Sequence, residues 1–194
     1  MIPTRGPAPS PIQHSPWLWA VLATTLVAAG TLWQLGLNQR LFLFLNSLGK
    51  GETAGLFWAN ATLLGDTLVA FTLLGLFARR RFDIVWALLL SALFTTAWVH
   101  GLKNLLEVLR PLAVLGADAV HVLGVPLHKH SFPSGHTATA FTLAGIICLH
   151  RVPPLLAGSA LLVAILAGLS RAVVGAHWPL DILAGAFGGW LCAA

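Results

Sequence analysis

Apolar runs of roughly the length needed to cross a bilayer recur along most of the chain, and short polar stretches separate them. Because a helix rises about 1.5 Å per residue, about 20 apolar residues span the hydrocarbon core of a membrane. The composition fits, since 57% of the residues are hydrophobic and only 9% are charged, against about a quarter in soluble domains. We predict an all-α integral membrane bundle of six transmembrane helices, at about residues 17–37, 58–78, 84–106, 133–150, 155–169 and 178–194.

The first residues differ from the rest. Residues 1–16 are rich in proline and polar residues, so we expect a disordered tail followed by one transmembrane domain over residues 17–194. A signal peptide is the alternative for the first apolar run. That run is long for a signal peptide and no small-residue cleavage site follows it, which favours a retained helix. Residues 38–52, with basic residues flanking Leu-Phe-Leu-Phe-Leu, are typical of a short interfacial segment.

The basic residues give the orientation, because cytoplasmic loops are enriched in lysine and arginine. With six spans and the N-terminus inside, the inner segments hold Arg5, Arg79, Arg80, Arg81 and Arg151. The outer segments hold Arg40, Lys50, Lys103, Arg110, Lys129 and Arg171. The counts of 5 and 6 become 5 and 3 when the three residues in polar motifs are set aside. We therefore predict a multi-pass inner-membrane protein with both termini cytoplasmic and its polar motifs at the outer face.

The most polar stretch between two apolar runs is Ser170-Arg171-Ala-Val-Val-Gly-Ala-His177-Trp-Pro-Leu-Asp181. If Trp178 and Pro179 open a helix, His177 and Asp181 are four residues apart on one face. The carboxylate can then accept a proton from one ring nitrogen, which leaves the other nitrogen a free lone pair. Such a pair is more often a structural hydrogen bond, so the spacing alone does not establish catalysis.

Two further stretches are polar: residues 103–111 contain two basic residues, and residues 133–136 precede an apolar run and could begin a helix. Lys103 and Arg110 are seven apart and share a face if their helix continues to Pro111. Together with Arg171 they would put three cations in one outward pocket, which implies a polyanionic ligand, although interfacial snorkelling is the alternative. Residues 133–136 read Pro-Ser-Gly-His at the start of an apolar run. Free amides at a helix N-terminus bind phosphate oxygens, and the Ser134 hydroxyl can add a further donor.

In order, these motifs read Lys-x6-Arg-Pro, Pro-Ser-Gly-His and Ser-Arg-x5-His-x3-Asp over residues 103–181. This resembles the three-part signature of the type 2 phosphatidic acid phosphatase superfamily, which contains membrane lipid phosphatases and, more distantly, soluble acid phosphatases and vanadium haloperoxidases. The resemblance implies that His177 is a nucleophile that forms a phosphohistidine, that Asp181 orients it, and that His136 protonates the leaving oxygen and then assists water. It also implies a phosphate site made of Lys103, Arg110, Ser134, Gly135 and Arg171.

The activity that the resemblance implies is hydrolysis of a lipid phosphomonoester or pyrophosphate. Undecaprenyl pyrophosphate, phosphatidylglycerophosphate, phosphatidic acid and lipid A phosphates are all candidates, because the motif residues contact only the phosphate. A lipid phosphotransferase that uses the same site is one alternative. A non-enzymatic lipid-phosphate transporter or receptor is another, but binding alone requires the cations and not the His–Asp pair.

Metal and nucleic-acid partners are not expected. The chain has six acidic residues, and only Asp181 is a signature position, so no carboxylate cluster offers a site for Mg²⁺ and we expect no cofactor. The basic residues form no stripe interleaved with aromatic residues, which argues against nucleic acid. The expected partners are the bilayer and a lipid phosphate, and the sequence leaves the oligomeric state open. Cys148 and Cys192 lie in apolar runs and suit packing.

Several other polar residues support smaller predictions. His100 lies one turn before Lys103; we expect a buried, hydrogen-bonded histidine there, and contact with the pocket is the alternative. We also expect Glu107 to pair with Lys103, and Asp66 to lie in the outer half of the second span near the site. A solvated outer loop is expected to contain His121, His128, Lys129 and His130.

Overall fold

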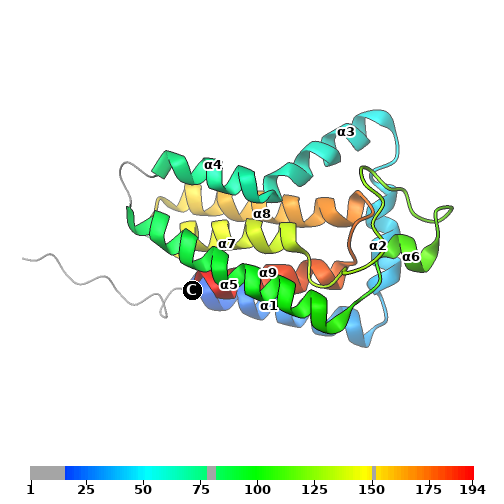
Figure 1. The fold of residues 1–194 in the computed structure, drawn as a ribbon, viewed down its shortest axis with the longest axis horizontal. Coiled ribbons are helices and arrows are strands. Elements are labelled where there is room, and N and C mark those ends of the chain that lie inside the picture. The colour runs from blue at the N-terminus through cyan, green and yellow to red at the C-terminus, as the bar shows by residue number, and fades with distance from the viewer. Residues whose placement is uncertain (1–15, 78–81, 150–151) are drawn as a thin grey trace, which may run out of the picture.

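The computed structural model describes residues 16–77, 82–149 and 152–194, and all regular elements in these ranges are helical (Figure 1). The helices are α1 (Pro16–Gln34), α2 (Asn38–Ser47), α3 (Glu52–Ala61), the 3₁₀ turn η2 (Thr62–Gly65), α4 (Thr67–Phe77), α5 (Phe82–Leu106), α6 (Pro111–Leu115), α7 (Gly135–Leu149), α8 (Pro154–Val173) and α9 (Pro179–Ala193). The predicted all-α class is confirmed. Residues 1–15 of the predicted tail and Arg79–Arg81 lie outside the described residues.

Three helices in the described ranges, α1, α5 and α8, are long and apolar enough to cross a membrane. The second predicted span is not one straight helix, because α3 with η2 and α4 meet at a bend of 63°. Helices α7 and α9 are apolar but have only 15 residues each. Large apolar side chains are exposed around the bundle, among them Trp33, Leu68 and Leu155, as suits a multi-pass membrane protein. The six crossings themselves stay a prediction.

Helix α7 lies at the centre of the bundle and packs against α5, α8 and α9 (Figure 1). Small residues let α7 and α9 approach closely: a Cβ on Gly189 would lie 2.2 Å from the carbonyl oxygen of Ala138. A buried hydrogen bond of 2.8 Å joins the hydroxyls of Thr95 on α5 and Thr142 on α7. This packing fixes where α7 and α9 begin, and the predicted site lies at those two helix starts.

Helices α2 and α6 lie at the same end of the bundle as the starts of α7 and α9 (Figure 1). Phe42 of α2 is fully buried, and its ring centroid lies 5.1 Å from that of Trp178. The segment predicted to be interfacial thus contains the helix α2, whose buried face packs against the N-terminal start of α9. This end of the bundle holds the polar residues of all three motifs.

Candidate active site

The hinge between α8 and α9 carries the histidine of the predicted His–Asp pair. Helix α8 ends at Val173, and α9 begins at Pro179 with Trp178 as its N-cap residue. Proline is favoured at the first helical position because its missing amide hydrogen would have no partner there. The Asp181 carboxylate accepts the amide of Trp178 at 2.9 Å and so caps the helix. The helix start predicted at Trp178 and Pro179 is confirmed.

Two contacts from outside the hinge hold it in place. Gly175 has φ +80°, and a Cβ there would lie 2.6 Å from the carbonyl oxygen of His121, so the turn requires glycine. The buried side-chain amide of Asn46 donates to the carbonyls of His121 at 2.7 Å and Val173 at 2.9 Å. Helix α2 therefore fixes the hinge against the connection between α6 and α7.

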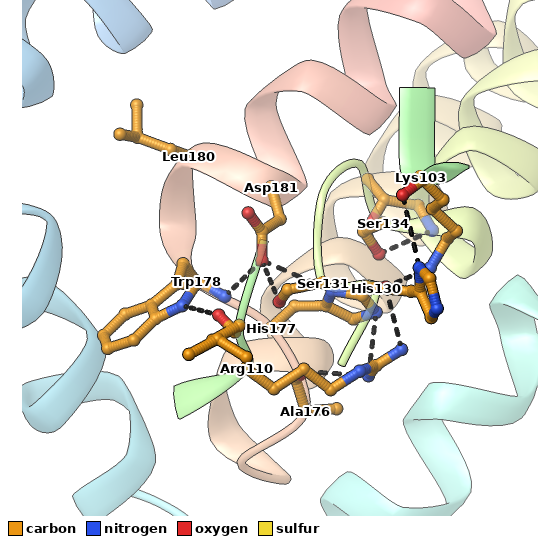
Figure 2. A network of polar contacts seen from close by, with 12 residues as sticks. Lys103, Arg110, His130, Ser131, Ser134, Ala176, His177, Trp178, Leu180 and Asp181 are labelled. Carbon is orange, nitrogen blue, oxygen red and sulfur yellow. Dashed lines mark hydrogen bonds and ion pairs between the residues drawn. The ribbon is translucent and has the colours of Figure 1, made fainter. Parts of the chain in front are cut away.

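Three groups gather around one oxygen of the buried Asp181 carboxylate (Figure 2). The Ser131 hydroxyl donates to Oδ2 at 2.5 Å, the Trp178 amide donates at 2.9 Å, and Nδ1 of His177 lies 3.4 Å away. The last distance is longer than a well-formed hydrogen bond, so it is an electrostatic contact that a small ring rotation would shorten. Nε2 of His177 lies 3.4 Å from Nη1 of Arg110. Since Nδ1 faces a carboxylate and Nε2 faces a donor, the geometry favours a proton on Nδ1.

The surroundings of His177 keep its ring neutral. Only 2% of the residue is exposed, and this burial lowers the pKa of His177 to about 4, although Asp181 acts in the opposite direction. The positive charges of Arg110 and Arg171 lower the pKa further. At neutral pH the imidazole is therefore uncharged and Nε2 keeps the lone pair that a nucleophile requires.

This pKa gives a prediction for the pH dependence of hydrolysis. If the neutral ring is the nucleophile, kcat/KM for p-nitrophenyl phosphate should persist as the pH falls from 7 to 5 and decline as it approaches about 4. This substrate is chosen because nitrophenolate is a good leaving group, so a proton from His136 matters little to the profile. The second ionisation of the substrate is measured by ³¹P NMR and removed from the profile. Recovery of activity at pH 7 controls for acid denaturation. A corrected acid limb near 6.5 would contradict a desolvated His177.

Ser131 is a residue that the sequence motifs did not single out. Its side chain is fully buried, and its hydroxyl is the nearest donor to Oδ2 of Asp181. We expect Ser131→Ala to lower kcat about tenfold, because the carboxylate becomes free to turn away from His177. Inhibition by vanadate should change little, since the cations remain in place. Ser47→Ala is the matched control, because the Ser47 hydroxyl is exposed on α2 and donates to the carbonyl of Phe44.

The side chains of two of the three predicted cations are held by backbone carbonyls, those of Lys129, His130 and Ala176 (Figure 2). Arg110 donates through Nε to the carbonyl of Lys129 at 2.9 Å and through Nη1 to that of Ala176, also at 2.9 Å. Lys103 donates through Nζ to the carbonyl of His130 at 2.7 Å. The carbonyls restrain both side chains without neutralising their charge, so the positive potential remains available to an anion.

The predicted reason for the closeness of Lys103 and Arg110 was wrong. Helix α5 ends at Leu106, so the two residues do not share a helix face. The chain leaves the helix through Glu107, which has φ +45°, and the Arg110 amide then donates to the carbonyl of His128 at 2.9 Å. The loop at residues 128–130 brings the two cations together instead.

Arg171 supplies the third cation from the last turn of α8. The side chain is 9% exposed, and Nη1 donates to Oγ1 of Thr62 in η2. Nε is buried and has no hydrogen-bond partner in the described part of the chain. A buried guanidinium N–H without a partner is costly unless a ligand accepts from it. The backbone carbonyl of Arg171 accepts the amides of Ala176 and His177, which ties this residue to the hinge.

The Pro-Ser-Gly-His motif lies at the start of α7, which begins at Gly135. The Ser134 amide donates to the carbonyl of Asp181 at 2.9 Å, and the Ser134 hydroxyl accepts from that of Thr137 at 2.8 Å. The Ser134 hydroxyl proton is thus left to bind an anion. His136 is half-buried in the first turn and interacts electrostatically with Lys103, Arg110 and Arg171.

The remaining polar residues divide between confirmed and wrong predictions. Asp66 lies near the site as expected, since its neighbour Gly65 abuts His136 and its carboxylate caps α4 by accepting the amide of Leu68. His100 is exposed on α5, so the prediction of a buried histidine is wrong. The ion pair expected between Lys103 and Glu107 is not seen among the described residues, where the Lys103 ammonium donates to the carbonyl of His130.

The fold and this group of side chains together define a class of protein. In residues 16–77, 82–149 and 152–194 the protein is an all-helical, multi-pass membrane bundle in which a buried histidine lies beside a carboxylate and three cations at one end. The family model for the PAP2 superfamily matches residues 82–194, which contain every residue of the three motifs. The chain belongs to the PAP2 superfamily.

Similar proteins include phosphatases that act on bacterial lipids. A lipid A 1-phosphatase of Rhizobium etli is 34% identical over 155 residues, which is 73% of this chain and 64% of the relative. YbjG of Escherichia coli K12, provisionally named as an undecaprenyl-diphosphatase, is 35% identical over 126 residues. The matched region covers 63% of this chain and 59% of the length of YbjG. This chain therefore spans about six tenths of the curated relatives. The crystal structure of LpxE from Aquifex aeolicus matches with a TM-score of 0.73 and 36% identity, over 81% of this chain and 92% of that one.

Proposed function

We propose that this protein is a membrane phosphatase that hydrolyses a lipid phosphomonoester or pyrophosphate through a phosphohistidine on His177, without a metal ion. The observation that carries the proposal is the state of His177: a buried ring with a pKa of about 4, with Nδ1 facing Asp181 and Nε2 facing the cations. A non-enzymatic binding protein would need the cations but would gain nothing from a desolvated nucleophile.

In the first step Nε2 of His177 attacks phosphorus, and the bond from phosphorus to the leaving oxygen breaks as the new N–P bond forms. His136 donates a proton to the leaving oxygen. The Asp181 carboxylate stabilises the positive charge that develops on the imidazole. In the second step His136 removes a proton from water, the water oxygen attacks phosphorus, and the N–P bond breaks to release phosphate and free His177.

Charge on the phosphoryl oxygens is stabilised by Lys103, Arg110 and Arg171, with the amides at the start of α7 and the Ser134 hydroxyl as further donors. These groups provide the neutralisation that Mg²⁺ supplies in many phosphoryl-transfer enzymes. The described residues contain no group of three or more His, Cys, Asp or Glu side chains placed to hold a metal ion. The donor set around His177 is cationic, which suits an anion and not a divalent cation.

The substrate class is a bacterial lipid phosphate or pyrophosphate. The names of two relatives point to undecaprenyl pyrophosphate and to the 1-phosphate of lipid A. Phosphatidylglycerophosphate and phosphatidic acid are phosphomonoesters that present a terminal phosphoryl group as well. Transfer to a second lipid hydroxyl in place of water would use the same intermediate, so it differs only in the acceptor.

The test is phosphate release by the purified protein in detergent from a panel of these four lipids, with and without excess EDTA. We expect release to continue in EDTA and to be inhibited by vanadate in competition with the lipid, since vanadate adopts the geometry of the transition state. Loss of activity in EDTA that Mg²⁺ restores would disprove the metal-free mechanism. Transfer of the phosphate to a lipid acceptor without release would instead indicate the phosphotransferase.

We also propose that the site faces the outside of the inner membrane and that both termini are cytoplasmic. In a protein lacking Cys148 and Cys192, a cysteine at Gly116 should react with an impermeant thiol reagent added to intact cells. A cysteine at Pro153, in the connection between α7 and α8 at the other end of the bundle, should react only after lysis. The reverse pattern would place the site in the cytoplasm.

A further inference from the structure

Two apolar hollows adjoin one another along the side of α8 that faces η2 and α4. The first, with a volume of about 460 Å³, lies between α3, η2 and Leu166 of α8. The second, of about 310 Å³, lies between α4, α7 and the stripe of α8 that contains Leu156, Ser159 and Val163. Leu64 of η2 lines both hollows, so together they form one groove, called here the α8 groove.

The α8 groove begins beside the phosphate-binding residues. Thr62, two residues before Leu64, accepts the hydrogen bond from Nη1 of Arg171. Gly65, the residue after Leu64, touches the start of α7, since a Cβ there would lie 2.7 Å from the carbonyl oxygen of His136. The turn η2 therefore contacts Arg171, the proposed acid His136, and the end of the α8 groove that lies nearest the phosphate-binding residues.

The direction and length of the α8 groove suit a hydrocarbon chain. Leu166, Val163, Ser159 and Leu156 follow one another down α8 from Arg171 toward the opposite end of the bundle. At 1.5 Å per residue, Arg171 and Leu156 are about 22 Å apart along the helix axis, more than half of the hydrocarbon thickness of a bilayer. Resting on the proposed function, we infer that the α8 groove binds an acyl or prenyl chain of the lipid whose phosphate is held at Arg171.

A larger groove of about 880 Å³ lies between α1, α5 and α9 and is the competing location. The linings of both grooves lack the three cations and both histidines. The competing groove reaches the site at Asp181 and Trp178, whereas the α8 groove reaches it at the turn that contacts Arg171 and His136. The Asp181 oxygen nearest the site is already shared by Ser131 and the Trp178 amide. A lipid lying there would have its phosphate behind the carboxylate, so the observations favour the α8 groove.

The test compares long and short chains on the same head group. The substrate pairs are dioleoyl and dihexanoyl phosphatidic acid, for an acyl chain, and undecaprenyl and farnesyl pyrophosphate, for a prenyl chain. Ser159→Trp and Leu64→Trp fill the α8 groove. Leu162→Trp, on a face of α8 that lines neither hollow, is the control, and Ala29→Trp fills the competing groove. Hydrolysis of p-nitrophenyl phosphate reports whether each variant is folded.

Each methylene that loses its contact weakens binding about fourfold, so the groove variants should raise KM for the long-chain member at least about tenfold. Their kcat should be unchanged, and the short-chain member should respond within about twofold, because chain binding is equal in ground and transition states. The pair that responds identifies the chain.

Equal effects on long and short substrates, no effect on either, or an effect confined to Ala29→Trp would overturn the inference. A groove variant that also loses nitrophenyl phosphate hydrolysis is treated as misfolded. The comparison of long and short substrates then rests on the other of the two variants, Ser159→Trp or Leu64→Trp. If the unmodified protein releases phosphate from none of the four lipids of the panel and from no member of either pair, the proposed function itself fails, a result that concerns the unmodified protein and not the groove variants.

Discussion

Replacing His177 by alanine should abolish turnover, with a loss of about 10⁴-fold or more in kcat, because no other side chain can take over an attacking nitrogen. Its ring is buried, neutral and the only proposed nucleophile in the site. Rapid quenching of the unmodified protein with ³²P-labelled substrate should trap an acid-labile phosphoprotein. The variant should trap none. Phosphate release and phosphoprotein labelling are both measured.

The matched control is His100→Ala, which removes an exposed histidine from α5. We expect full activity and full labelling in this variant. Asp181→Asn should keep a small residual rate, because an amide oxygen can still accept from Nδ1 but cannot stabilise an imidazolium. Comparable rates in His177→Ala and the unmodified protein would refute the phosphohistidine mechanism.

The second large effect is expected from Arg110→Lys, with a loss of about 10²-fold to 10³-fold in kcat/KM and a parallel loss of vanadate affinity. The Arg110 guanidinium donates to the carbonyls of Lys129 and Ala176, which lie in two different segments, while facing Nε2 of His177. A lysine ammonium is a point charge and cannot reach both carbonyls and the phosphate together. Vanadate inhibition constants and kcat/KM are the measurements.

Arg40→Lys is the control for Arg110→Lys, because Arg40 is an exposed cation on α2. It should change neither quantity by more than about twofold, since exposed charges contribute little. If Arg110→Lys lowers kcat/KM but leaves vanadate affinity unchanged, Arg110 shapes the loop and does not contact the phosphate.

Much of the fold followed from hydrophobicity and helix-start chemistry. Runs of apolar residues mark helices regardless of their neighbours, and a Trp-Pro-x-Asp sequence carries its own N-cap, so α9 was placed correctly. The break at Thr62–Gly65 was missed because Thr-Leu-Leu-Gly is as apolar as the helices around it. The chain bends where Gly65 packs closely against α7 and Asp66 caps α4. Gly-Asp is a local helix-boundary signal, but the prediction of one span over residues 58–78 did not use it.

The candidate site shows a similar division. The motifs identified the titratable residues, and the structure brings Lys103, Arg110, Ser134, His177 and Asp181 together (Figure 2). Ser131 and Thr62 could not be singled out, since a lone hydroxyl in a chain of this kind carries no signal of its partner. The third predicted span, residues 84–106, ends where α5 ends, whereas the continuation to Pro111 that would put Lys103 and Arg110 on one helix face does not occur.

The loop that restrains Lys103 and Arg110 does so through the main chain of residues 128–130. Any residue at positions 128 and 129 offers the same carbonyl oxygen, so these positions place little demand on side-chain identity. His130 differs, because its Nδ1 also lies 3.2 Å from the carbonyl oxygen of Lys103 and its φ is +54°. Substitutions at residues 128 and 129 should be tolerated, while a one-residue deletion should displace both cations at once. In a mutational scan, the constraint on this segment would show as intolerance to changes of length, at positions where substitutions look harmless.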